Sequence, residues 1–392
     1  MSRAVLIGAA TRRATVALLA ALGAMAATAL SGVAMAAVAL PSALQRPALK
    51  VAQPASAHLQ AVTRAGERLV AVGERGLVIY SDDSGRHWTQ ASVPVSVTLT
   101  AVRFASPSEG WAVGNMGAVL RSTDGGASWT RVFDGQRAAT LALQAAQQAW
   151  DAVRPDASQA EHPLKLLLDD AQRLVDEGAD KPFLDIALRA DGSVLVVGAY
   201  GLAFASADGG RSWQARMAAL PNPNGSTIYG AVERQREHYL FGEQGLLLRA
   251  ADTGAAWTAQ ASPTAGSLFG ALSLRSGALM LFGLRGKVYR SEQAGAPWVE
   301  LQTPVDASLI TGLQLADETV LLLGAAGQVV ASHDQGRTFA ALPMPTRFPF
   351  AGAALAPDGM LVIVGARGLL RVPQPSSRPA QASLMYNARQ SP

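Results

Sequence analysis

The sequence contains no cysteine, which excludes a disulfide framework, a thiolate metal site, a lipid-anchored cysteine and a cysteine nucleophile. Charged residues are also scarce, at 16% of 392 residues, with 33 lysines and arginines against 29 aspartates and glutamates. The basic side chains are spread along the chain and form no continuous stripe, so we expect no binding to nucleic acid. With 49% hydrophobic residues the chain is too apolar to be disordered.

Motifs for metals and cofactors are missing as well. The sequence has no phosphate-binding loop and no dinucleotide fingerprint, and its five histidines share no metal-ligand spacing. We therefore expect no metal and no cofactor. The histidines are His58, His87, His162, His238 and His333.

Residues 1–36 have the features of a signal peptide. Arginines precede an uncharged apolar stretch from Ala14 to Leu40, and Ala34-Met35-Ala36 is a small-x-small cleavage site. We predict export, cleavage near Ala36 and a periplasmic location. An uncleaved inner-membrane anchor is the alternative, because the apolar run is long enough to span a bilayer.

The remaining chain repeats a Gly-x-x-Gly pattern seven times. Successive copies are separated by 41, 84, 44, 41, 41 and 41 residues, so only the second step contains an extra segment. Each copy follows a run of Val, Leu or Phe. The first glycines of the copies are Gly73, Gly114, Gly198, Gly242, Gly283, Gly324 and Gly365.

Each repeat predicts four short strands. Runs of four to six apolar or β-branched residues alternate with turns rich in Gly, Asp, Asn and Pro, as in residues 99–132. One such sheet cannot bury both faces alone, so units of this length stack radially. We predict an all-β fold, a seven-bladed β-propeller of four-stranded antiparallel blades over residues 37–371.

The turn between the third and fourth strands carries a Ser-x-Asp-x-Gly-x-x-Trp motif, which resembles the Asp-box, or BNR repeat, of sialidase-like propellers. An Asp in a tight turn accepts backbone N–H bonds, and the aromatic ring packs between sheets, so we expect a structural role. Catalytic carboxylates would have to converge on one pocket, whereas these are distributed around a ring. The motif residues are Asp83, Trp88, Asp124, Trp129, Asp208, Trp213, Asp252, Trp257, Trp298, Asp334 and Phe339.

The seventh repeat ends near Arg371 without an Asp-box or a fourth strand. A sheet edge left open needs a cover. The apolar segment Ala48–Ala52 precedes the first repeat, and we predict that it supplies the missing strand and closes the ring. The tail from residue 372 to 392 is rich in Pro, Ser, Gln and Ala, so we expect disorder there.

The extra segment, residues 136–178, predicts a helical hairpin between blades 2 and 3. Leu164, Leu167, Leu168 and Ala171 follow helical spacing after Pro163, which suits a first helical turn. Connectivity places the hairpin on the face that carries the Gly-x-x-Gly turns, opposite the Asp-box turns. We expect a partner to bind this face, although exposed turn positions are polar in any case. The candidate partner-binding residues are Arg75, Tyr200, Arg285, Lys287 and Arg367.

Over residues 59–371 the repeats resemble the photosystem II stability and assembly factor type of BNR propeller more closely than true sialidases. The resemblance implies a scaffold or assembly factor for membrane proteins, without catalytic residues or cofactor, and an arginine-rich patch that engages the client. We therefore expect a periplasmic protein, monomeric by itself, that binds a membrane-protein or envelope complex, for example an exporter. The helical insertion departs from the family pattern.

A sialidase-type propeller that binds or hydrolyses glycans is the alternative. Such an enzyme needs converging arginines, a tyrosine nucleophile with a neighbouring Glu, and a separate acid. No Arg-Ile-Pro motif opens the repeats, and of the six tyrosines only Tyr200 and Tyr229 are placed to reach the open face. We therefore expect no enzymatic activity.

Overall fold

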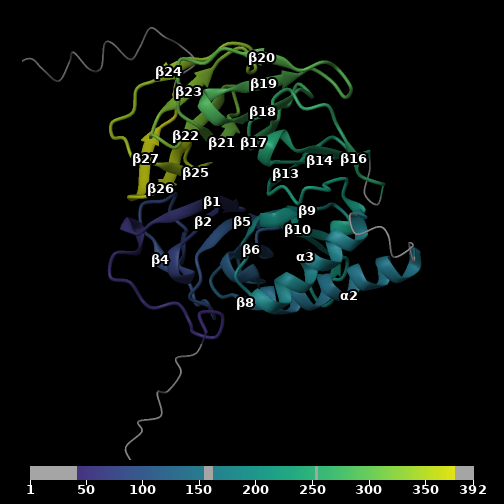
Figure 1. Cartoon of the computed structure of the whole chain (residues 1–392). Coiled ribbons are helices and arrows are strands. Elements are labelled where there is room, and N and C mark those ends of the chain that lie inside the picture. The colour runs from purple at the N-terminus through teal and green to yellow at the C-terminus, as the bar shows by residue number, and fades with distance from the viewer. Residues whose placement is uncertain (1–41, 154–161, 252–254, 376–392) are drawn as a thin grey trace, which may run out of the picture. The chain divides into compact units, whose positions relative to one another are not determined.

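Seven antiparallel sheets follow one another in this computed structural model, which describes residues 42–153, 162–251 and 255–375 (Figure 1). Six of the sheets have four strands in chain order, and the seventh has three within the described residues. We number the sheets blades 1 to 7 along the chain. The predicted all-β propeller with a two-helix insertion is confirmed.

The strands of each blade run from the centre of the ring outwards. Blade 1 contains β1 (Leu59–Ala65), β2 (Arg68–Gly73), β3 (Val78–Ser81) and β4 (Thr89–Gln90). Blade 2 contains β5 (Leu99–Phe104), β6 (Gly110–Gly114), β7 (Val119–Ser122) and β8 (Thr130–Phe133). Blade 3 contains β9 (Phe183–Leu188), β10 (Val194–Gly198), β11 (Ala203–Ser206) and β12 (Gln214–Ala215). Blade 4 contains β13 (Ile228–Arg234), β14 (Glu237–Gly242), β15 (Leu247–Ala250) and β16 (Thr258–Ala259).

The last three blades follow the same order. Blade 5 contains β17 (Leu268–Ser273), β18 (Leu279–Gly283), β19 (Val288–Ser291) and β20 (Val299–Leu301). Blade 6 contains β21 (Leu309–Gln314), β22 (Val320–Gly324), β23 (Val329–Ser332) and β24 (Ala340–Leu342). Blade 7 contains β25 (Phe350–Leu355), β26 (Met360–Gly365) and β27 (Gly368–Pro373).

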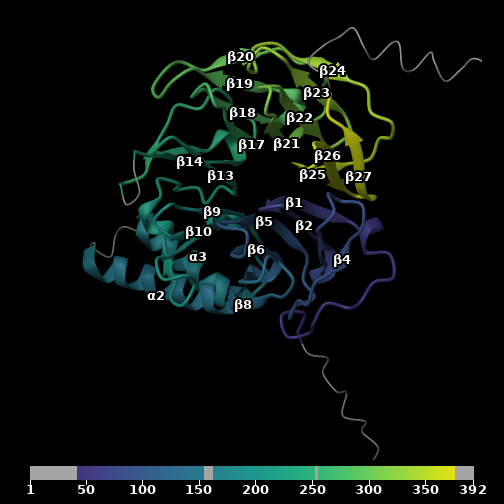
Figure 2. The ribbon, with the colours of Figure 1, turned by 180° about the vertical axis from the view of Figure 1, so that it is seen from behind.

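The first strands of the seven blades form the inner ring. Each of β1, β5, β9, β13, β17, β21 and β25 contacts the next one, and β25 contacts β1, so the circle is closed. Figure 1 shows these seven strands around the middle of the ring, and Figure 2 shows the same order from behind. Every inner strand starts at the same face of the ring, and the antiparallel second strand ends at that face. The Gly-x-x-Gly turns, which follow the second strands, therefore all lie on one face.

The first glycine of the Gly-x-x-Gly repeat has a packing cause that recurs in blades 1 to 5 and in blade 7, whereas an added Cβ at Gly324 of blade 6 would meet the side chain of Gln328. The first glycine pairs with the residue that begins the inner strand, as Gly283 does with Leu268. A Cβ atom at Gly283 would lie 2.1 Å from the carbonyl oxygen of Ser267, so the chain cannot approach this closely with a side chain there. The paired residues that begin the inner strands are all buried, namely Leu59, Leu99, Phe183, Ile228, Leu268, Leu309 and Phe350.

The hydrophobic core is divided into seven clusters, one between each pair of neighbouring blades. The cluster between blades 7 and 1 joins Leu69 to Val362 and Val364. Around it, Arg371 Nε donates to the Ser84 carbonyl oxygen at 2.9 Å, and Arg86 pairs with Asp358 at 2.8 Å. Side-chain packing and these polar contacts therefore hold the first and last blades together.

The strand predicted to close blade 7 is not there, and the closure expected from Ala48–Ala52 is wrong. The Ala48 N–H donates to the Val93 carbonyl oxygen at 3.0 Å, and the Val51 N–H donates to Gln90 Oε1 at 2.9 Å, so the segment lies beside blade 1. The next turn, η1 (Pro54–Ser56), contacts β27 without pairing as a strand. Flanking prolines at positions 47 and 54 and the side chain of Gln90 explain why no ladder forms.

The insertion forms two helices, α2 (Gly135–Val153) and α3 (Pro163–Glu177), which contact each other and lie beside β8 to β10 in both views (Figures 1 and 2). Asp134 Oδ1 accepts the N–H groups of Gln136 and Arg137, each at 3.1 Å, and so caps the start of α2. Helix α2 buries a row of small side chains against blades 2 and 3: Ala138, Ala139, Ala142 and Ala146.

The structure describes only part of the two terminal segments for which the sequence made predictions. Residues 1–36, predicted to be a signal peptide, and residues 376–392 of the tail predicted to be disordered lie outside the described residues, so both stay predictions. Strand β27 continues to Pro373, two residues past the predicted propeller end at residue 371. Within residues 42–153, 162–251 and 255–375, no helix combines the length and apolar character needed to cross a bilayer.

Candidate partner-binding surfaces

The face that carries the Gly-x-x-Gly turns and the insertion is called here the insertion face. Helix α2 contacts the turn η3 (Asn115–Gly117) of blade 2, as connectivity predicts. In five blades the residue before the second glycine is not glycine yet has φ between 53° and 58°. This left-handed conformation is disfavoured for residues with a side chain. The five residues are Arg75, Met116, Tyr200, Gln244 and Arg285.

Four of the five predicted partner-binding residues are exposed and only loosely tied to the protein. Tyr200 is 66% exposed, and the Nζ atom of Lys181 lies 5.1 Å from the centre of its ring. Arg75, Arg285 and Arg367 are exposed and form no ion pair with other described residues. These arginines belong to blades 5, 7 and 1, so they are spread over one side of the ring and do not converge on one point.

Lys287, the fifth predicted residue, has a partner within its own blade. Its Nζ atom pairs with Glu300 of β20, and the hydrogen bond from this carboxylate raises the pKa of Lys287. Lys287 and Arg285 line one cavity of about 290 Å³ beside Leu284. Only these two predicted residues therefore share a hollow, and one of their charges is already balanced.

A groove beside α3 was not expected from the sequence. It has a volume of about 270 Å³ and runs between α3 and the connection from blade 3 to blade 4, with Tyr200 at one side. Leu166 of α3 lines it and is 47% exposed. The opposite wall includes Met217, Leu220 and Pro221. The leucine periodicity of α3 was visible in the sequence, but which leucines stay exposed depends on how the helix packs.

The central channel holds a cavity of about 710 Å³ lined by all seven inner strands. Among its lining residues Asp185 is the only carboxylate. Arg103 of the preceding blade donates to both of its oxygens at 2.9 Å, and the Ala231 N–H of the next blade donates at 3.1 Å. Asp185 thus links blades 2, 3 and 4. In the sequence, Asp185 stands out as the one carboxylate in the otherwise apolar strand Phe183–Leu188, and this could have indicated a buried ion pair.

The channel gives little support to glycoside chemistry. A two-carboxylate mechanism needs a second acid across the channel, and the lining residues include none beside Asp185. Tyr229, which was predicted to reach an open face, lines the channel. Burial and the nearby charge of Glu243 raise its pKa, which works against a tyrosinate nucleophile. The described residues also contain no cluster of three or more His, Asp or Glu side chains that could hold a metal.

The Ser-x-Asp turns occupy the other face, called here the opposite face. In blade 1 the Ser81 hydroxyl donates to Asp83 Oδ1 at 2.8 Å, and the Gly85 N–H donates to Ser81 Oγ at 2.8 Å. Hydrogen bonds from the backbone N–H and the ring of His87 lower the pKa of Asp83. Blades 2, 3 and 6 repeat this pattern around Asp124, Asp208 and Asp334. These carboxylates are engaged within their own turns, and Asp252 lies outside the described residues.

The pH dependence of stability can test whether the charge of Asp334 stabilises its turn. Burial raises the pKa of Asp334, but hydrogen bonds from Ser332, Thr338 and Arg337 outweigh it and lower the pKa from 3.8 to about 2. A carboxylate with a lowered folded pKa stabilises the fold above its unfolded pKa and loses that effect as the pH falls through the folded value. Asp334→Asn should therefore reduce the free energy of unfolding by about 1 kcal/mol at neutral pH, a modest value for a site that is partly exposed to solvent.

The measurement is urea unfolding of wild type and Asp334→Asn between pH 7 and about pH 2. The difference between the two proteins should shrink between about pH 4 and pH 2, as the wild-type carboxylate takes up its proton. Asp306→Asn, an exposed carboxylate outside these turns, is the matched control and should show no such difference. A difference for Asp334→Asn that does not vary with pH would contradict the role of its charge.

The repeats match the family model of the photosynthesis system II assembly factor YCF48 over residues 81–147 and 168–309, more than half of the chain. The chain belongs to the YCF48 family. This confirms the family resemblance expected from the repeats. The YCF48 match is interrupted within the insertion, where this chain departs from the family pattern.

Solved structures of YCF48 are similar to the chain over nearly their whole length. YCF48 from Cyanidioschyzon merolae is 14% identical, covers 81% of this chain and 96% of its own, and has a TM-score of 0.57. A structure described as YCF48 bound to D1 peptide is 18% identical, covers 84% of this chain and 100% of its own, and has a TM-score of 0.56.

Enzymes share the fold too. A catalytically inactive virginiamycin B lyase from Staphylococcus aureus is 12% identical, with a TM-score of 0.61 and coverage of 83% of this chain and 98% of its own. At such identities the likeness to any of these solved structures shows the fold alone. No curated protein is significantly similar in sequence.

Proposed function

We propose that this YCF48-family propeller is a non-enzymatic scaffold that binds a segment of a membrane protein. It acts as an assembly factor or accessory subunit of a membrane-protein complex in the periplasm, with an exporter as one candidate. Family membership, together with the related YCF48 described as bound to D1 peptide, carries the proposal. The single, already saturated carboxylate of the channel favours binding over glycan hydrolysis.

The insertion face is the proposed contact surface. It combines three exposed arginines that lack ion pairs within the described residues with an apolar groove beside α3. Arginines and exposed aromatic residues such as Tyr200 are the side chains that most often dominate protein interfaces. The helices also complete no blade, and long structured insertions in compact repeats are usually functional.

The ends of the insertion lie next to each other, so it can be removed. An added Cβ atom at Gly135 would lie 3.0 Å from the Cα atom of Ala179. Deleting residues 136–178 with a short Gly-Ser linker keeps every strand but uncovers Phe133 and its neighbours, so some stability will be lost. A second variant, Leu166→Lys with Tyr200→Ser, keeps both helices and changes only exposed side chains.

We expect both variants to recover less of a membrane-protein client when they are purified from detergent-solubilised membranes. Charge reversal of Arg75, Arg285 and Arg367 to Glu should weaken recovery further, and more strongly at low salt. The matched control reverses arginines on the opposite face, which changes the net charge equally. Those residues are Arg64, at the end of β1, and Arg211 and Arg337, each three positions after a turn carboxylate.

The comparison uses the wild type, the three insertion-face variants and the control at two salt concentrations. Recovery of the same partners in equal amounts by all of them would show that the insertion face is not the contact surface. Loss of recovery only in the opposite-face control would move the contact to the Ser-x-Asp turns.

A further inference from the structure

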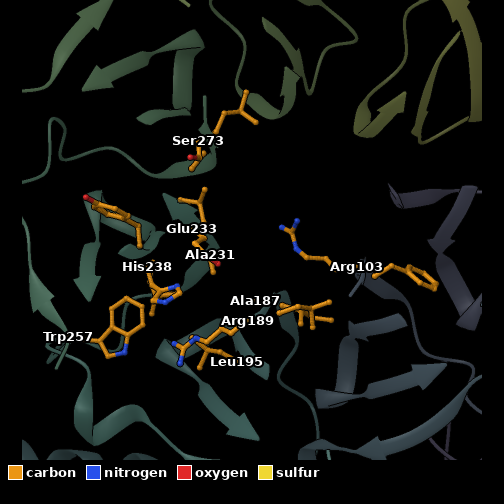
Figure 3. Close-up of a pocket in the computed structure, with 17 residues that line it drawn as sticks. Arg103, Ala187, Arg189, Leu195, Ala231, Glu233, His238, Trp257 and Ser273 are labelled. Atoms are coloured by element: carbon orange, nitrogen blue, oxygen red, sulfur yellow. The ribbon is translucent and has the colours of Figure 1, made fainter. Parts of the chain in front are cut away.

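A second hollow lies at the opposite mouth of the channel, between blades 3 and 4. It has a volume of about 390 Å³ and opens where the inner strands β9 and β13 end (Figure 3). Its walls include Ile186, Leu195 and Leu240, and the aromatic ring of Trp257 stands at one side. The hollow therefore combines an apolar floor with the charged side chains Arg103, Arg189 and Glu233.

Arg189 is the unusual residue of this pocket. None of the hydrogen bonds or ion pairs among the described residues involves its guanidinium, and its Nε atom is buried without a partner. Burial lowers the pKa of Arg189, and the charged groups that act on it are Asp191, Arg216 and Glu233. The terminal nitrogens are not among the buried unpaired atoms, so they remain open to a ligand. Figure 3 shows the side chain directed toward Trp257 and His238.

Two neighbouring arginines, Arg103 and Arg234, have hydrogen-bond acceptors within the protein, whereas the guanidinium of Arg189 has none among the described residues. Arg103 donates to both oxygens of Asp185, and Arg234 Nε donates to the Gly277 carbonyl oxygen at 2.7 Å. A partly buried guanidinium without an acceptor is costly, because it has lost water and gained no hydrogen bond in return. The missing acceptor at Arg189 is therefore the group that a ligand would supply, and a carboxylate matches the guanidinium fork.

Glu233 supplies the complementary charge. It lines the same pocket, is exposed, and forms no hydrogen bond or ion pair through its side chain with other described residues. Its charge acts on Arg189, but the two groups form no ion pair. A ligand that presents a carboxylate to Arg189 can therefore present an N–H group to Glu233.

We propose that this pocket binds the α-carboxylate end of an apolar amino acid, either the C-terminal residue of a peptide or the free amino acid. The carboxylate contacts the terminal nitrogens of Arg189, the neighbouring N–H donates to Glu233, and the apolar side chain lies against Trp257 and Leu195. The site is at the mouth opposite the insertion face. It stands independently of the proposed binding of a membrane protein.

The test is calorimetric titration of the purified protein with three probes: L-leucine, acetyl-Ala-Ala-Leu with a free carboxylate, and the C-terminal amide of the same peptide. We expect the amide to bind at least about tenfold more weakly than the free acid, because it cannot form the charged pair with Arg189. Arg189→Met should reduce the affinity for the free acid by a similar factor. Its melting temperature should stay equal or rise, since the variant removes a buried unpaired group.

The probes also separate the two sources of the ligand. Glu233→Gln should weaken L-leucine, which carries a charged amine, more than the acetylated peptide, which offers only an amide N–H. Tight binding of the peptide alone assigns a peptide C-terminus, and tight binding of leucine alone assigns the free amino acid. Absence of binding by both at millimolar concentration, or equal binding of acid and amide, would overturn the proposal.

Arg285→Met is the matched control, an exposed arginine on the insertion face. It should leave binding of the probes unchanged. Conversely, Arg189→Met should leave recovery of a membrane-protein client unchanged. The proposals for the pocket and for the insertion face can thus be confirmed or refuted independently. Probe binding that is lost in Arg285→Met and kept in Arg189→Met would place the carboxylate site on the other face and refute this pocket.

Discussion

Replacing Trp213 by alanine is expected to destabilise the propeller by about 3–5 kcal/mol, the usual cost of removing a buried aromatic side chain. Trp213 is 5% exposed and belongs to the cluster between blades 2 and 3. Its ring stacks on Phe133 with centroids 4.8 Å apart and meets Trp111 edge-on at 6.4 Å. Its Nε1 atom donates to the Gly210 carbonyl oxygen at 3.1 Å, so the same residue joins the turn to the neighbouring blade.

Equilibrium unfolding in urea of the wild type and Trp213→Ala measures this effect. Trp257→Ala is the matched control, because Trp257 occupies the same position in the turn of blade 4 but is only half-buried. We expect its loss to cost less than half as much, in line with the smaller area removed from water. A cost below about 1 kcal/mol for Trp213→Ala would show that the stacked aromatic residues are not essential to the contact between blades 2 and 3.

The fold was predictable because its determinants are local and repeated. The spacing of Gly283 and Gly286, copied seven times, marks the same hairpin in each blade, and apolar runs before and after it mark the strands. The helices were predictable for the same reason, since the spacing of Leu164, Leu167, Leu168 and Ala171 is a local signal that spans only about two helical turns. Repetition makes such local signals cumulative, because each blade buries its faces only against copies of itself.

The closure of the ring was not predictable, because it depends on contacts between residues far apart in the sequence. A short apolar segment such as Ala48–Ala52 fits any open sheet edge by pattern alone. The side chain of Gln90, which accepts from Val51 and donates to the Leu49 carbonyl oxygen, holds it beside blade 1. Local periodicity does not indicate whether such a segment lies beside the outer edge of blade 1 or the outer edge of blade 7.

The candidate sites show the same limit. The face on which Arg75 and Arg285 lie follows from strand order, which the repeat gives. Whether an arginine has a partner depends on one residue of another blade, as Arg103 and Asp185 show across 82 positions of sequence. Arg189 resembles Arg103 in the sequence, at the end of an inner strand, and only the structure shows that it lacks an acceptor among the described residues.

The second position of each turn requires glycine for a different structural reason from the first, as Gly286 shows. Its φ is +67°, and an added Cβ atom would lie 2.1 Å from the Val305 carbonyl oxygen, in the connection that leads from blade 5 to blade 6. That connection crosses directly over the turn. A side chain at position 286 would therefore meet the backbone that orients the next blade.

We expect Gly286→Ala to destabilise the protein by about 2–5 kcal/mol, from left-handed backbone strain and the displacement of Val305 together. Gly295→Ala is the matched control in the same blade, because Gly295 also has a positive φ of +74° but no atom within 4 Å of an added Cβ. It should show the conformational cost alone, about 1–2 kcal/mol. Urea unfolding of both variants separates the two contributions. Equal losses of unfolding free energy in the two variants would mean that the connection containing Val305 shifts at no cost. Positive φ alone would then explain the second glycine of the repeat.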